Sequence, residues 1–148
     1  MLAVMSLMLS CGKDGDGVDT QYPSIDLSFD GAFPVQCSTV KRGETFVFRA
    51  NFSDNVALGS YSLDIHHNFD YHTHSTEAKE CDMDPVKAPV NPLEDIYSAQ
   101  IPEGLRTFEA AMEIEVPEDI DPGDYHFMIR VTDKAGWQTM KGLSIKIQ

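Results

Sequence analysis

Basic residues are scarce in this chain of 148 residues: 11 Lys and Arg stand against 24 Asp and Glu, and the formal net charge is −13. Proteins that bind nucleic acid need a basic surface to neutralise phosphate groups. Adsorption to anionic lipid head groups needs the same sign of charge. The composition therefore predicts no nucleic-acid partner and no membrane contact made by the protein surface itself.

Long apolar runs are missing as well. The run MLAVMSLMLS at residues 1–10 is too short for a membrane-spanning helix, which needs roughly 20 residues. It ends in a small residue directly before Cys11, which is the layout of a secretory signal. The motif Leu9-Ser10-Cys11 resembles a bacterial lipoprotein box, in which the cysteine thiol receives a diacylglycerol before cleavage. We therefore predict a lipoprotein signal peptide over residues 1–10 and lipidation of Cys11.

The residues behind Cys11 are rich in Gly, Lys and Asp and have little apolar surface to bury, so residues 11–22 are predicted to be a flexible tether. Lys13-Asp14 and Asp16 resemble the export signal that sends Bacteroidota-type lipoproteins to the outer face of the outer membrane. The sequence thus predicts an outer-membrane protein that is lipid-anchored and exposed at the cell surface. The acyl chains on Cys11 would be its membrane contact.

Cysteine is rare too, with three in the whole chain. If Cys11 is lipidated, Cys37 and Cys81 remain as an even pair in an oxidising compartment, where disulfides persist. We predict that these two residues form a disulfide. Two free thiols are the alternative.

No segment shows a sustained period of 3.6 residues with helix caps, so helix is expected to be minor. Apolar residues alternate instead, which is typical of strands with one buried face. Turn residues such as Asp121-Pro122-Gly123 separate the segments. Several short strands without helices indicate an all-β sandwich or barrel. The alternating segments are residues 24–30, 44–52, 61–67, 107–117, 124–133 and 143–147.

Two motifs favour an immunoglobulin-like β-sandwich of about seven strands over residues 23–148. Asp121 to Tyr125 opens a strand in the manner of a tyrosine corner, although Phe127 stands where antibody domains have cysteine. The motif VTDKAGW is similar to the hairpin of bacterial Ig-like modules, with Trp137 in the place of asparagine. We expect Trp137 to cap one end of the sandwich rather than to hold a ligand.

Residues 68–104 interrupt the alternation with four prolines and form a long Pro-rich insertion, in which only residues 96–101 alternate. A long irregular stretch inside a compact domain is either functional or tied down. A bridge to Cys81 would tie it down, and a histidine cluster stands at its start. We therefore expect this insertion to be the working part of the protein.

The stretch HHNFDYHTHS at residues 66–75 holds four of the five histidines, and neutral imidazole is the commonest metal ligand. If the segment is extended, a His-x-His pair lies on one face. Zinc, with copper as second choice, needs further ligands beside that pair. The alternative is that these are solvated loop histidines. The predicted metal ligands are His66, His67, His72, His74 and Glu77.

Two further residues belong to this hypothesis, and the fifth histidine is left out of it. Asp70 is an alternative to Glu77 as the carboxylate ligand, and Asp64 is expected to orient an imidazole from behind. His126, which lies opposite in parity to Tyr125, is expected to be an ordinary surface histidine.

The lipoprotein signal, the stretch NFSDNVALGSYSLDIHHNFDYHTHS and the motif VTDKAGW together resemble the Bacteroidota lipoproteins classed as domain of unknown function 4625. The resemblance covers roughly residues 20–148 and implies an Ig-like sandwich on a lipid anchor. It implies no particular activity.

Three classes of function follow from the residues. The first is a cell-envelope protein that binds a transition metal, and the second is an accessory or adhesion module for a glycan or an outer-membrane protein. The third, an enzyme, is not expected, because the sequence has no G-x-S-x-G motif, no free catalytic cysteine and no paired acid and base.

Overall fold

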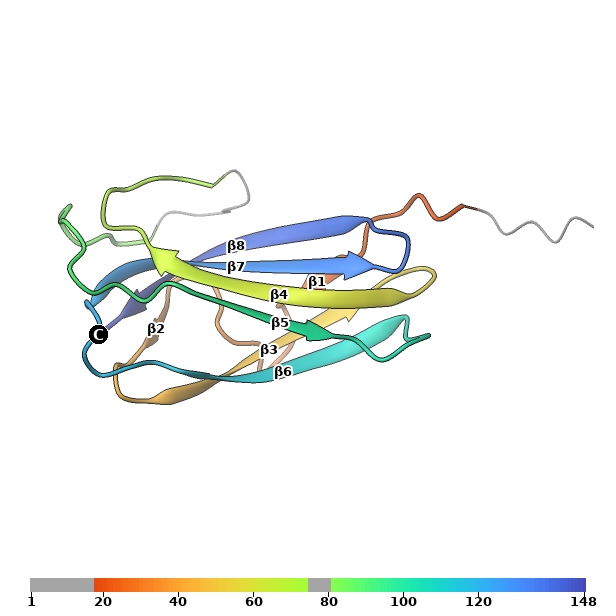
Figure 1. Ribbon diagram of the computed structural model, residues 1–148, viewed down its shortest axis with the longest axis horizontal. Coiled ribbons are helices and arrows are strands. Elements are labelled where there is room, and N and C mark those ends of the chain that lie inside the picture. Colours follow the sequence, from red (N-terminus) through yellow and green to blue (C-terminus); the bar gives the residue numbers. More distant parts are fainter. Residues whose placement is uncertain (1–17, 75–80) are drawn as a thin grey trace, which may run out of the picture.

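The computed structural model describes residues 18–74 and 81–148 of the chain (Figure 1). No helix in these ranges is long and apolar enough to cross a membrane. The described residues form eight strands: β1 (Ser24–Asp26), β2 (Ser38–Val40), β3 (Thr45–Ser53), β4 (Leu58–His67), β5 (Asp95–Gln100), β6 (Thr107–Glu115), β7 (Gly123–Asp133) and β8 (Gln138–Ile147).

The strands form two sheets that are packed face to face. The smaller has the order β1-β3-β6 and the larger the order β2-β8-β7-β4-β5. All neighbours are antiparallel except β2 and β8, which are parallel. β3 and β6 correspond to strands B and E of an immunoglobulin sandwich, and β4, β7 and β8 to strands C, F and G. The predicted all-β, Ig-like sandwich is confirmed, with eight strands.

The core lies between the sheets because apolar side chains alternate along the strands that face each other. On β3, Phe48 and Phe52 are buried, and on β4 the same holds for Tyr61, Leu63 and Ile65. The rings of Phe48 and Phe52 pack against Tyr61 with centroids 6.2 and 5.3 Å apart. Alternation thus identified the inward residues of the long strands correctly.

β1 is shorter than its alternating residues suggest. Ile25, Leu27 and Phe29 continue one parity, but the strand ends at Asp26. The Asp26 carboxylate accepts hydrogen bonds from the backbone N–H (2.8 Å) and the hydroxyl (2.5 Å) of Ser28, which turn the chain away.

The predicted tyrosine corner is present at the start of β7. The Tyr125 hydroxyl donates to the carbonyl of Asp121 over 2.6 Å and accepts from the backbone N–H of Leu93 over 3.3 Å. Burial raises the pKa of Tyr125 to about 12. The corner therefore fixes the entry into β7 and one end of the segment that precedes β5.

The described parts of the β4–β5 segment, residues 68–74 and 81–94, lie against the outer face of the larger sheet (Figure 1). They are tied to β7 and β8. The backbone N–H of Asp84 donates to Asp124 Oδ2 over 2.7 Å, and Lys146 pairs with both carboxylates. A disulfide joins Cys37 to Cys81, as the sequence predicted, with 5.6 Å between the Cα atoms.

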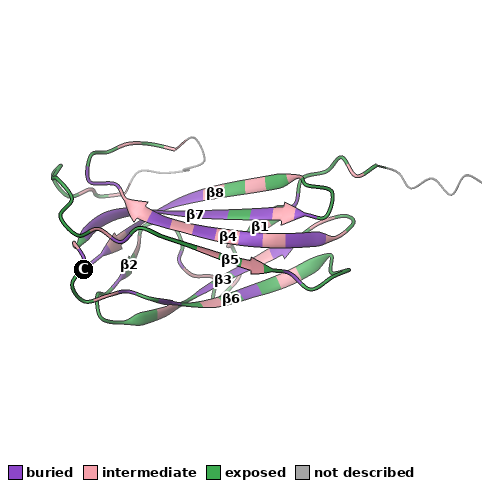
Figure 2. Cartoon of the chain, viewed as in Figure 1, coloured by how far each residue is buried: buried purple, intermediate pink, exposed green. Residues whose placement is uncertain are grey.

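The cover changes the burial of β7. The strand is buried along most of its length on both faces, as Figure 2 shows, whereas a bare sandwich strand alternates. On its outer face, Asp124, His126 and Met128 have exposed fractions of 5%, 0% and 7%. The first part of β7 is therefore covered on its outer face, and this cover positions the site described next.

Candidate metal centre

The first two histidines come from neighbouring strands. On β4, alternation turns Ile65 into the core and His66 outward. β4 pairs with β7 so that His66 stands directly opposite His126. Their rings lie 5.2 Å apart between centroids. The register of the larger sheet thus places two imidazoles side by side on its outer face.

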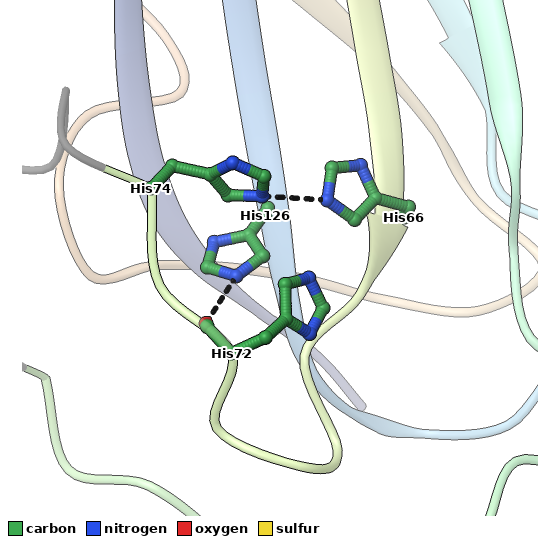
Figure 3. Close-up of side chains that lie close together, drawn as sticks. All are labelled: His66, His72, His74 and His126. Atoms are coloured by element: carbon green, nitrogen blue, oxygen red, sulfur yellow. Dashed lines mark hydrogen bonds between the residues drawn. The ribbon is translucent and has the colours of Figure 1, made fainter.

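The next two histidines come from the chain just after β4. A turn closes when the backbone N–H of Tyr71 donates to the carbonyl of Asn68 over 3.4 Å, with Tyr71 at a positive φ of 62°. The chain then runs back over the sheet. There the carbonyl of His72 accepts a hydrogen bond from His126 Nε2 over 3.0 Å. This return brings His72 and His74 beside His66 and His126 (Figure 3).

The four side chains form one group, which we call the histidine cluster: His66, His72, His74 and His126. Each offers one ring nitrogen, and these four atoms all lie within 4.8 Å of one another. His66 Nε2 and His74 Nε2 are 3.1 Å apart. The rings of His72 and His74 lie 4.7 and 4.6 Å from that of His126.

Two carboxylates stand behind the cluster and determine which nitrogen faces it. His66 Nδ1 donates to Asp64 over 2.7 Å, and His72 Nδ1 donates to Asp70 over 2.6 Å. The hydrogen bond from His72 lowers the pKa of the Asp70 carboxyl, which keeps it an acceptor. In a neutral imidazole the other nitrogen then carries the lone pair. Both histidines therefore present Nε2 to the cluster.

His126 was expected to be a surface histidine, and this prediction was wrong. It is fully buried, because the chain at His72 lies across it. Burial lowers the pKa of His126 from 6.5 to about 4. The hydrogen bond to His72 acts in the opposite direction and raises this pKa. Charge on the neighbouring histidines His74, His72 and His66 lowers it further. His126 is therefore neutral at physiological pH. Because Nε2 donates to the His72 carbonyl, Nδ1 carries the lone pair.

The structure does not bring His67 into the cluster. Its ring packs on Phe69 with 5.0 Å between centroids, and its Nε2 lies 3.7 Å from a Glu94 oxygen. Glu77 lies outside the described residues, as do Cys11 and the predicted signal peptide. Asp64 stands behind His66, as the sequence analysis expected. Asp70, the alternative carboxylate ligand, accepts a hydrogen bond from His72 Nδ1 and is not part of the histidine cluster.

The cluster fits a transition metal by its chemistry. Zn²⁺ is bound by imidazole nitrogens at about 2.0–2.1 Å in tetrahedral geometry, which requires ligand nitrogens about 3.3–3.4 Å apart. The nitrogens of His66 and His74, 3.1 Å apart, are close to that spacing, and all four nitrogens lie within 4.8 Å of one another. Hydrogen bonds from ligand imidazoles to carboxylates are typical of zinc sites. Ca²⁺ and Mg²⁺, which prefer oxygen ligands, do not fit this donor set.

Fold and site together define a class: an immunoglobulin-like β-sandwich with a histidine cluster on the outer face of its larger sheet. The chain belongs to the family described as Domain of unknown function (DUF4625), whose profile matches residues 9–148.

Among solved structures, the chain is similar to one described as "GspB Siglec domain", with 19% sequence identity and a TM-score of 0.45. The match covers 88% of this chain and 59% of that one, so the chain spans less than two thirds of its length. A comparison with curated proteins finds no match.

Proposed function

We propose that this protein binds a transition metal, with Zn²⁺ as the first choice and Cu²⁺ as the second, through the histidine cluster. The observation that carries the proposal is the convergence of four imidazole nitrogens within 4.8 Å from β4, β7 and the β4–β5 segment. One histidine in a loop needs no ligand to explain it. Four that meet from three segments, two of them backed by carboxylates, supply the number of ligands that a tetrahedral zinc site needs.

The cluster is accessible from solvent, and its buried histidine is neutral at neutral pH. The side chains of His66 and His72 keep exposed fractions of 24% and 37%, which leaves a path for an ion from solvent. His126 holds no proton that a metal must displace at neutral pH. Protons compete with metals for imidazole, so affinity should fall as pH drops through about 6.5.

The number of ligands favours a carrier or structural role over catalysis. Catalytic zinc sites use three protein ligands and keep a fourth position for water or substrate. Four histidines would fill all four positions. We therefore propose a protein that holds, scavenges or relays a metal and is not an enzyme.

The proposed setting is the cell envelope. The sequence pattern at Cys11 supports a lipid anchor in the outer membrane, with the sandwich exposed at the cell surface. A metal-binding module in this place would meet ions before they enter the cell.

The proposal is tested by metal binding to the full chain. Metal content after purification and calorimetric titration with Zn²⁺ and Cu²⁺ should show one site per chain. The His72→Ala/His74→Ala double variant should bind Zn²⁺ at least about 100-fold more weakly, because it retains two of four ligands. Both residues lie outside the strands, so the sandwich should still fold.

His67→Ala is the matched control, since His67 is adjacent to His66 in sequence but outside the cluster. Its affinity for Zn²⁺ should equal that of the wild type. If the wild type binds neither metal more tightly than the double variant does, the four histidines are a polar network without an ion.

In that event the alternative function takes over: an accessory or adhesion module that binds a glycan or an outer-membrane protein. The feature that favours it is β5, the edge strand of the larger sheet, where Ile96 is 76% exposed. An exposed apolar residue on a sheet edge is suited to strand addition by a partner.

A further inference from the structure

A second group of metal-ligating side chains lies at the other end of the sandwich. Three segments meet there: the described residues that precede β1, the turn between β3 and β4, and the turn between β7 and β8 (Figure 1). The backbone N–H of Lys134, in the β7–β8 turn, donates to the carbonyl of Ala57, in the β3–β4 turn, over 2.9 Å. The Trp137 indole donates to the carbonyl of Asp19 over 2.8 Å.

One aspartate comes from each segment, and we call Asp19, Asp54 and Asp133 the aspartate cluster. Each places a carboxylate oxygen within 4.8 Å of the other two. Backbone and amide donors hold one oxygen of each residue in place. Asp54 Oδ2 accepts from two backbone N–H groups at 2.8 Å, Asp133 Oδ1 from that of Trp137 at 2.8 Å, and Asp19 Oδ1 from the Asn55 side chain at 3.1 Å.

The remaining oxygens of two of these residues are buried and have no hydrogen-bond partner among residues 18–74 and 81–148. Asp133 is only 4% exposed. The two oxygens without a partner are Asp133 Oδ2 and Asp54 Oδ1. A buried carboxylate oxygen that has lost its water and gained no donor costs free energy. These two buried carboxylate oxygens therefore need a partner, and the described protein groups do not supply one.

In the described part of the chain, no lysine or arginine side chain offsets the three charges. Across residues 18–74 and 81–148, none of the three aspartates forms an ion pair with a lysine or arginine. Lys134, which follows Asp133 in sequence, pairs with Glu103 over 3.7 Å instead. Three like charges at this spacing repel one another unless a counter-ion lies between them.

A glycine makes the close approach possible. Gly59 lies where the pairing of β4 with β7 shifts register. A Cβ atom there would stand 2.9 Å from the carbonyl oxygen of Asp133 and 3.0 Å from that of Thr132. Only glycine lets the end of β7 come this near to the start of β4, and this contact places Asp133 beside Asp54.

We propose that Asp19, Asp54 and Asp133 bind a calcium ion, which fastens the residues before β1 to the end of the sandwich. Calcium takes about 6–8 oxygen ligands in flexible geometry, so three carboxylates leave room for backbone oxygens and water. Zinc and copper prefer nitrogen or sulfur, and magnesium demands near-ideal octahedral geometry. The ion would supply the counter-charge and the partner that the buried oxygens lack.

Calcium binding at this site would affect the segment that precedes β1. Asp19 precedes β1 and lies in the segment predicted as a tether, and Tyr22 packs on Trp137 with 4.9 Å between ring centroids. A calcium ion held partly by Asp19 would fix this segment against the sandwich. Loss of calcium would release it. The affinity expected is that of extracellular calcium modules, about 10⁻⁴–10⁻³ M.

Terbium luminescence tests this site, because Tb³⁺ replaces Ca²⁺ at oxygen sites and emits strongly only beside an excited aromatic ring. Trp137 is the only tryptophan in the chain, and its backbone N–H binds Asp133. Excitation of Trp137 in the full chain should give Tb³⁺ emission that saturates and that Ca²⁺ abolishes by competition. Asp133→Asn and Asp19→Asn should each weaken Ca²⁺ binding roughly tenfold or more.

The matched control is Asp30→Asn, which makes the same change of charge at an exposed aspartate outside the cluster. It should bind as the wild type does. Asp133→Asn keeps the oxygen that accepts from Trp137, and Asp19 lies outside the strands, so the fold should survive in at least one variant. Emission that fails to saturate in the wild type, or that both cluster variants leave unchanged, overturns the proposal.

Thermal unfolding gives a second readout, because the effect of the variant on the unfolding temperature should differ with and without calcium. With calcium in excess, Asp133→Asn should unfold at a lower temperature than the wild type, because it loses the bound ion. In a calcium chelator it should unfold at the same or a higher temperature, because one of three repelling charges is gone. A variant that is equally destabilised in both conditions would show a structural role alone and would overturn the proposal.

Discussion

At the scale of single residues, carboxylates determine which imidazole nitrogen two of the four histidines offer. Asp64 and Asp70 accept from Nδ1 of His66 and His72, and this leaves Nε2 of both rings facing the cluster. A carboxylate in this position also raises the basicity of the ligand and fixes the orientation of its ring. Metal affinity should therefore depend on residues that never touch the ion.

We predict that Asp64→Asn weakens Zn²⁺ binding about 10- to 100-fold without unfolding the protein, because His66 loses its charged acceptor. Calorimetric titration measures the effect. Glu94→Gln is the control, since Glu94 lies 3.7 Å from His67, a histidine outside the cluster. Equal loss of affinity in both variants would contradict a role for Asp64 behind the ligand.

His126 should make the stability of the metal-free protein depend on pH. Its folded pKa is about 4, against 6.5 for an exposed histidine, so between these values the unfolded state takes up a proton that the folded state refuses. Stability is full above about pH 6.5 and falls as pH decreases toward 4. At pH 4.5 the loss should be about 2–3 kcal/mol.

Urea unfolding of metal-free wild type and His126→Gln at pH 7 and 4.5 measures this loss. Glutamine does not titrate and can still donate to the His72 carbonyl, while the other titrating groups are common to both proteins. The wild type should lose more stability than the variant. The same loss in both would assign the pH dependence to other groups.

His126 also shows where the sequence was insufficient. Alternation placed it correctly on the outer face of its strand, but an outer face is solvated only when nothing covers it. The cover comes from His72, 54 positions earlier in the chain. Met128 shares that outer face, and an apolar residue there was the available signal that the face is enclosed.

At the scale of elements, the disulfide and the β4–β5 segment act together. The bond links residues separated by 44 positions, and a crosslink that closes a loop of this length stabilises the folded state by about 4 kcal/mol in the chain-entropy model. It also fastens the segment that carries two of the four histidines. Stability and metal binding should therefore both depend on it.

We predict that the Cys37→Ser/Cys81→Ser variant unfolds at a lower temperature than the wild type and binds Zn²⁺ more weakly, since the segment must be ordered on binding. Thermal unfolding with and without Zn²⁺ measures both effects. Saturating Zn²⁺ should raise the unfolding temperature of both proteins. Unchanged affinity for Zn²⁺ would show that the histidines are positioned without the bond.

Most strands were predictable because each long strand carries its own alternation. β2 was missed, since it has three residues of which only Val40 is buried, and its partner β8 lies about a hundred residues later in the chain. His72 and His74 were predicted as ligands from their spacing alone. Their positions depend on contacts with β7, which no local pattern encodes.

At the scale of the whole molecule, the net charge of −13 keeps the sandwich away from anionic membrane surfaces, so any attachment must come from elsewhere. The apolar run before Cys11 predicts that the attachment is covalent lipid. Cys11→Ala should release the protein from the membrane fraction into the soluble fraction. Cell fractionation and the mass of the N-terminal peptide measure this. Continued membrane association with no acyl mass on that peptide would contradict lipidation.

β7 contributes one residue to each proposed site, His126 near its beginning and Asp133 at its end. Seven extended residues span about 24 Å, roughly three times the Debye length of about 8 Å at physiological ionic strength. Charge on one ion would be screened from the other, and a strand held on both sides does not change length. The coupling free energy between the two sites should therefore be close to zero. Occupancy by calcium and occupancy by zinc would then be two independent variables, so that one domain has four liganded states rather than a single on–off switch.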